Sequence, residues 1–320
     1  MRRRVGLVLG GAIGAGVAVQ ARVNGALGER LHDGVGAAVV SFGTGLLLVG
    51  VIFLVSGRLR AGLGQVREAL ADGTLRWWQL LGGLCGALFV ACQGLTVATI
   101  GVTAFTVSVV AGQLVSSLVV DRLGIGPGGR TAVTAWRVGG ALLASAAVLL
   151  AALGRPRGVS ESLAAPAFFR DAPPAVLIAL PILAGVGVAW QQAVNGRVGA
   201  VGGPLSATLA NFVTGLAGLL AVEALLRIHS GLPSELPSAP WLYLGGAIGV
   251  FFIALAVLVV RWIGVLLLAL TSVAGQLLAA LVLDVLAPTG STLAPMAVAG
   301  CVLTFAAVAL AARSPRPNPR

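Results

Sequence analysis

The chain has 320 residues, is 58% hydrophobic and only 10% charged, and has a mean hydropathy of +1.01. Soluble domains carry about 25% charged residues, so this composition excludes a soluble globular protein and predicts one embedded in lipid. The net charge of +11 does not indicate a nucleic-acid partner, because all 21 basic residues are Arg and lie near the ends of apolar segments.

Ten apolar segments follow one another along the chain. Each approaches the roughly 20 residues that a membrane-spanning helix needs, and none has the alternation of a β-barrel strand. We therefore expect an all-α membrane protein with ten transmembrane helices, since backbone polar groups in lipid must bond internally. The segments are residues 5–23, 35–55, 79–98, 101–120, 133–153, 175–194, 204–226, 242–260, 263–283 and 293–312.

The sequence contains an internal repeat. A shift of 163 lays residues 78–121 on 241–284 with 20 of 44 positions identical, and a shift of 171 lays residues 14–28 on 185–199 with 9 of 15 identical. Each half carries five segments. Because five crossings leave the chain on the opposite side of the membrane, the second copy must insert with the opposite orientation to the first. Inverted repeats of this kind are typical of secondary transporters, whose substrate site lies between the repeats.

The repeat divides the chain into four parts. We predict a first five-helix repeat at 1–153, a linker loop at 154–174, an inverted second repeat at 175–312 and a disordered cytoplasmic tail at 313–320. The first segment is a working helix rather than a signal peptide, because it recurs in mid-chain at 175–195. With the N-terminus in the cytoplasm, 15 Arg face that side and 6 face the other, so both termini are expected in the cytoplasm of a multi-pass protein of the inner membrane.

Two Gln residues are predicted near the bilayer midplane. Gln113 lies about twelve residues into its segment, Ser117 follows one turn later, and Ser272 and Gln276 form the corresponding stripe in the second half. An unpaired amide in hydrocarbon costs several kcal/mol, so these side chains should face the interior. We interpret all four as candidate substrate-binding residues; structural hydrogen bonding is the alternative.

A second pair of amides is repeated at the end of the first segment of each half. Gln20 and Asn24 share one helix face, and Gln191 and Asn195 repeat that face. Both interpretations stay open for these four residues: substrate binding, or interhelical hydrogen bonds that hold the repeats together.

An aspartate ends the Gln113 helix and its copy. Asp121 and Asp284 both lie where the helix dipole disfavours a carboxylate, so their presence needs a cause. One candidate is proton coupling or gating. The other is structural ion pairing, for which Arg122 is the neighbour of Asp121, whereas Asp284 has no basic neighbour in sequence.

Other chemistry is not expected. The sequence contains no HExxH motif, no Cys/His cluster and no nucleophile–base pattern, and the absence of Lys excludes a phosphate-binding Lys motif. The three Cys are interpreted as small packing residues. We therefore predict neither an enzyme nor a cofactor or metal.

Four motifs together resemble a known family. They are Gln20-x-x-x-Asn24-Gly25, the Ser-Phe-Gly-Thr-Gly run at 41–45, residues 78–86, and Gly112-Gln113 leading to Asp121. They are similar to the YdcZ-like branch of the drug/metabolite transporter (DMT) superfamily, and the resemblance implies an EamA-like bundle. Members of that branch are often single five-helix units, so this chain resembles a fused pair. The corresponding run at 211–215 in the second half differs from the Ser-Phe-Gly-Thr-Gly run and reads Asn-Phe-Val-Thr-Gly.

The resemblance implies transport of a small metabolite or drug, often efflux. The leading hypothesis is a proton- or gradient-coupled carrier that works by alternating access and has membrane lipids around it. A flippase of lipids or lipid-linked substrates is the alternative, although no intramembrane Arg cluster offers a head-group pocket. A non-transporting scaffold is the third, and it would not need paired midplane amides. A ten-helix chain completes the bundle as a monomer, and a homodimer stays open.

Overall fold

A computed structural model describes residues 1–320 except 32, 154–172, 228–236, 287–294 and 314–320. Every regular element in the described ranges is a helix. The predicted linker at 154–174 and tail at 313–320 fall almost wholly outside these ranges. In chain order the elements are α1 (Arg2–Leu31), α2 (Gly34–Val55), α3 (Gly57–Ala71), η1 (Trp77–Leu81), α4 (Gly82–Leu123), α5 (Ala135–Leu153), α7 (Pro174–Gly202), α8 (Pro204–Arg227), η2 (Pro240–Tyr243), α9 (Leu244–Leu286) and α10 (Pro295–Ala312).

Six helical stretches in the described residues are long and apolar enough to cross a membrane, judged by length and composition. Shorter apolar helices cover Trp77–Cys92, Ala135–Ala151 and Val298–Ala312. The predicted all-helical membrane bundle is therefore confirmed, whereas the count of ten crossings stays a prediction. The six are Arg2–Gly28, Gly34–Val55, Phe105–Leu123, Ala175–Gly202, Pro204–Leu225 and Pro240–Ala279.

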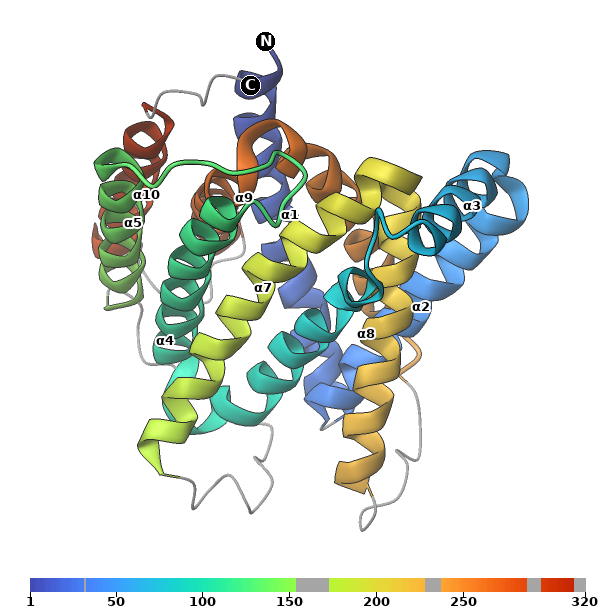
Figure 1. Cartoon of the computed structure of the whole chain (residues 1–320). Helices are drawn as coiled ribbons and strands as arrows, with labels where there is room; N and C mark the ends of the chain where they lie inside the picture. The colour runs from blue at the N-terminus through green and yellow to red at the C-terminus, as the bar shows by residue number, and fades with distance from the viewer. Residues whose placement is uncertain (32, 154–172, 228–236, 287–294, 314–320) are drawn as a thin grey trace.

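Two helices are too long for one crossing. The 42 residues of α4 and the 43 of α9 would each extend about 63 Å if straight, twice the roughly 30 Å of bilayer hydrocarbon. Gly264 breaks α9 with φ 81° and ψ 174°, a conformation that glycine adopts without steric cost. Figure 1 shows the two arms of α9 meeting at the top of the view and the two arms of α4 meeting near the bottom.

Helices of one half pack on helices of the other. The backbone of α1 at Gly14 lies against the carbonyl of Ser272 in α9, with no room for a β-carbon. In the same way, α7 at Gly185 lies against the carbonyl of Val109 in α4. The two contacts are equivalent in the repeat, because the shift of 171 relates 14 to 185 and the shift of 163 relates 272 to 109. Glycine permits this close approach of backbones.

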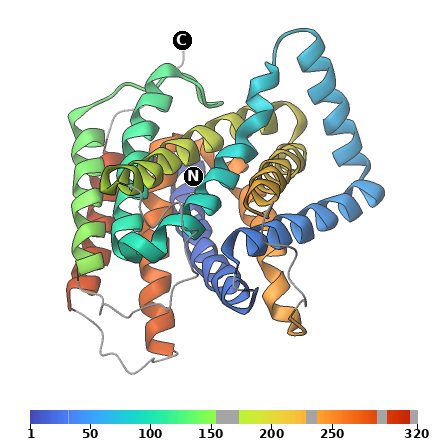
Figure 2. The ribbon, with the colours of Figure 1, turned by 90° about the horizontal axis from the view of Figure 1, so that it is seen from below.

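The pairing of α5 with α10 follows the same rule. Gly140 of α5 lies against the Ala307 carbonyl, and Gly300 of α10 lies against the Ala147 carbonyl. A shift of 160 converts one contact into the other. Figures 1 and 2 show these two helices side by side at one edge of the molecule.

The helices α2 and α8 contact each other through two aromatic rings. The Phe42 and Phe212 ring centroids are 5.2 Å apart. Each ring also lies over a glycine of the opposite helix, Phe212 over Gly45 and Phe42 over Gly215. A shift of 170 relates Phe42 to Phe212 and Gly45 to Gly215. The two ring–glycine contacts are therefore equivalent in the repeat, and they join the two halves.

The ends of the described chain lie together. The Arg3 guanidinium donates to the Ala312 carbonyl at the end of α10. The first turns of α1 also contact the region of the α9 break, since Gly6 lies against Ile263. We call this end of the bundle, at the top of Figure 1, the terminal end.

Candidate functional site

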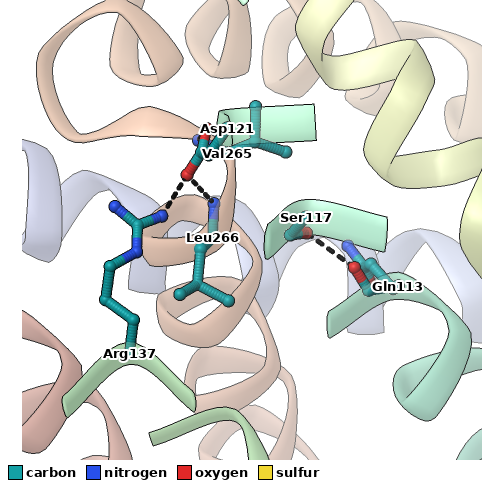
Figure 3. Close-up of polar contacts among 6 residues, drawn as sticks. All are labelled: Gln113, Ser117, Asp121, Arg137, Val265 and Leu266. Carbon is teal, nitrogen blue, oxygen red and sulfur yellow. Dashed lines mark hydrogen bonds and ion pairs between the residues drawn. The ribbon is translucent and has the colours of Figure 1, made fainter. Parts of the chain in front are cut away.

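The buried carboxylate of Asp121 joins three helices at the terminal end (Figure 3). It lies in the last turn of α4 and forms an ion pair with Arg137 of α5. Its Oδ1 accepts a hydrogen bond from the Val265 N–H at 3.0 Å, and its Oδ2 accepts one from the Leu266 N–H at 3.1 Å. Asp121 and Arg137 are each 5% exposed, so this is a charged pair within the protein interior.

The break at Gly264 explains why an aspartate is needed there. The first N–H groups of a helix have no partner within that helix, and they carry the positive end of its dipole. The second arm of α9 begins immediately after Gly264, so its first N–H groups face the Asp121 carboxylate. Asp121 is therefore unfavourably placed for its own helix but favourably placed for α9.

The basic partner of Asp121 differs from the neighbour considered in the sequence analysis. Arg122 is exposed, and Arg137 forms the ion pair. Arg137 lies 16 residues further along the chain and reaches the carboxylate because α5 packs beside the end of α4. Sequence proximity gave no indication of this pairing.

Arg197 of α7 fastens the end of α4 from the other half. Its Nε donates to the Ile125 carbonyl at 3.1 Å, and its Nη2 donates to the Gly124 carbonyl at 3.0 Å. Gly124, with φ 70°, is the left-handed residue that ends α4. We call Asp121, Arg137 and Arg197, with the backbone groups they bind, the clasp; it joins α4, α5, α7 and α9.

Gln113 lies at the crossing of α4 with α7. It is 8% exposed, and its backbone N lies close to Gly185 of α7. Ser117, one turn later and fully buried, donates its hydroxyl to the Gln113 backbone carbonyl at 2.6 Å (Figure 3). Ser117 therefore satisfies its own hydroxyl within α4.

Gln276 lies at the crossing of α9 with α1. It is half-buried, and its Nε2 lies 3.5 Å from the Ser272 Oγ, at the limit of a hydrogen bond. The neighbouring Gly275 lies against the Gly11 backbone. No described hydrogen bond joins Gln113 to Gln276, so the two amides lie at equivalent crossings rather than in one bonded cluster. Asp284 also lies in α9, but its side chain is outside the described part.

The amides in the second half of α1 face the first arm of α9. Gln20 Nε2 donates to the Gly245 carbonyl at 2.9 Å. Asn24 lies against Gly245, and its Oδ1 is buried without a hydrogen-bond partner among the described residues. Gln20 therefore bonds α1 to the other half, and Asn24 packs against the same glycine.

The corresponding amides of α7 bind a residue missing from the predicted site. Gln191 Nε2 and Asn195 Nδ2 both donate to the Oδ1 of Asn211 in α8, each at 2.8 Å. Asn211 is fully buried and its Nδ2 has no partner among the described groups. The shift of 170 places Asn211 on Ser41. The sequence therefore marked this position only by the difference between the halves, with Ser in the first and Asn in the second.

The apolar bundle with its interior amides and charged clasp defines a multi-pass α-helical membrane protein. The sequence matches the model of the family described as "Putative inner membrane exporter, YdcZ" over residues 5–150 and 176–310. The chain therefore belongs to the YdcZ family of the DMT superfamily, and the resemblance inferred from its motifs is confirmed. It is an inner-membrane protein of a transporter family.

No curated protein matches the chain. A solved structure described as "Crystal structure of protein" covers 97% of this chain and 96% of its own, with a TM-score of 0.61 and 19% identity. At that identity the likeness supports the fold alone.

Proposed function

We propose that this protein is a secondary carrier that exports a small metabolite or drug across the inner membrane. It works by alternating access between two inverted five-helix repeats. The family is one of transporters, and the contacts within this chain support the export mechanism.

The observation that carries the proposal is the reciprocity of contacts between the halves. α1 crosses α9 through Gly14 and Ser272, and α7 crosses α4 through Gly185 and Val109, at positions that the repeat makes equivalent. Two repeats with equivalent contacts can each adopt the conformation of the other at similar energy. This exchange is the basis of alternating access in transporters built from inverted repeats. The bends of α4 and α9 at opposite ends of the bundle support the inverted relation (Figure 1).

The substrate is proposed to lie between these two crossings. Gln113 and Gln276 provide the central amides, and Ser117 and Ser272 lie one turn away on the same helices. Gln20, Asn24, Gln191 and Asn195 would complete the polar surface when the helices separate. Asp121 and Asp284 are proposed as the gating or coupling carboxylates, and the terminal end is placed in the cytoplasm.

A ligand screen tests this proposal. The purified wild type and a Gln113→Ala/Gln276→Ala double variant would be heated with a panel of metabolites, drugs and lipids, with Val115→Ala, on the exposed face of α4, as the matched control. One class of small molecule should raise the Tm of the wild type and control but not of the folded double variant. Stabilisation by lipids alone, or an unchanged response of the double variant, would contradict the proposal.

A further inference from the structure

We propose that Arg137 and Arg197 are positioning residues that hold the terminal end of the carrier closed. They act through Asp121 and the end of α4, and the carrier opens toward the terminal end only when the clasp releases. This inference rests on the proposed carrier function. Neither Arg belongs to the repeated amides and aspartates.

The clasp joins the two halves at one end. Asp121 and Arg137 belong to the first half, whereas Arg197 and the N–H groups of Val265 and Leu266 belong to the second. A pathway that opens between the halves at the terminal end must separate these groups. The clasp therefore opposes opening at that end.

Partial release of the clasp is costly. Removing one partner of a buried ion pair leaves an uncompensated charge in a low-dielectric interior. Loss of Arg137 leaves the buried Asp121 carboxylate with only the two α9 N–H groups among its described partners. In the closed arrangement the Asp121 carboxylate keeps all three of these partners, the guanidinium and the two N–H groups.

The second half does not repeat the arginines of the clasp. A shift of 160, which lays residues 138–150 on 298–310 with 7 of 13 identical, places Arg137 on Ala297. The shift of 171 places Arg197 on Ala26. The reciprocal α5–α10 contacts of Gly140 and Gly300 support the first correspondence. The two arginines of the clasp therefore have no counterpart at the equivalent positions of the repeat, where both residues are Ala.

The test measures access to a buried position just inside the clasp. Ser117→Cys is introduced after replacing Cys85, Cys92 and Cys301 with Ala; Ser117 is fully buried, one turn from Asp121. A membrane-impermeant maleimide is applied to each face of the membrane, in intact cells and in inverted vesicles. A separate Arg2→Cys variant, at an exposed site, identifies the terminal face.

We expect slow labelling of Ser117→Cys while the clasp is intact. Arg137→Met should raise the labelling rate about tenfold from the terminal face and leave the other face unchanged, within the usual range of conformational coupling. Arg137→Lys should restore most of the protection, since it keeps the positive charge. Arg197→Met should act in the same direction and carries the test if Arg137→Met does not fold, because it leaves the ion pair in place.

A purely structural role gives a different pattern. Equal increases from both faces, or an unchanged rate with a lowered Tm, would overturn the inference. Labelling needs no substrate, so the outcome is separable from the ligand screen. If labelling increases from the terminal face but no ligand raises the Tm, the carrier proposal is contradicted and the clasp is not. If a ligand raises the Tm but labelling does not increase from the terminal face alone, the clasp is contradicted and the carrier is not.

Discussion

The carboxylate of Asp121 binds the helix start that Gly264 creates. Gly264 interrupts α9 with φ 81°, and the next two N–H groups point at Asp121 of the other half. A carboxylate that is unfavourable at the end of α4 is thereby favourable at the beginning of an α9 arm. A helix break in one half and an acidic residue in the other form a single structural unit.

Replacing Gly264 should disturb this unit. Gly264→Ala must hold a β-carbon at positive φ, about 1–2 kcal/mol of strain, and 3.3 Å from Asp121 Oδ2. We expect a lower Tm in detergent. Gly50→Ala in α2, where no atom lies within 4 Å, is the matched control and should keep or raise the Tm. Equal responses of the two variants would argue against the special role of Gly264.

The buried ion pair should show strong coupling. Arg137→Met and Asp121→Asn are each expected to destabilise by roughly 3–5 kcal/mol, because each leaves one buried charge unpaired. The double variant removes both charges and should lose less than the sum. A double-mutant cycle from thermal unfolding measures the difference. Additive losses would contradict a direct pair.

The reciprocal crossings should respond alike. Gly14→Ala and Gly185→Ala each place a β-carbon against a backbone carbonyl of the other half, and overpacking of this kind costs about 1–3 kcal/mol. Similar falls in Tm are expected from both. Gly43→Ala, which meets nothing within 4 Å, should show no such fall. A large difference between Gly14 and Gly185 would be evidence against equivalent roles.

Asn211 should stabilise the interior of the second half. Asn211→Leu removes the acceptor shared by Gln191 and Asn195, and the orphaned donor of the buried Asn195 alone costs about 1–3 kcal/mol. Asn211→Ser, which installs the residue type found at Ser41, should be better tolerated. Val213→Ala on the exposed face of α8 is the control, with Tm as the measure. Tolerance of Leu at 211 would show that the amide cluster is dispensable.

Part of this architecture could be predicted from the sequence. Hydropathy located the apolar helices, and the repeat identified amides that form interhelical hydrogen bonds, such as Gln191 and Asn195. The helix partners could not be predicted, because a repeat shows that two contacts are equivalent without showing which helices make them. The Asp121–Arg137 pair was missed for the same reason, since an intervening loop separates the residues and only the packing of α5 brings them together.

Alternating access is tested most directly by the accessibility of the two central Gln positions. Gln113→Cys and Gln276→Cys, each in the cysteine-free background, would be treated with an impermeant maleimide from each face of the membrane. Val115→Cys, exposed on the outer face of α4, is the control, because a thiol in lipid stays protonated and unreactive. Alternating access predicts that both Gln positions are labelled from both faces and that Val115→Cys is not. Labelling of either Gln position from one face only, or from neither, would contradict it.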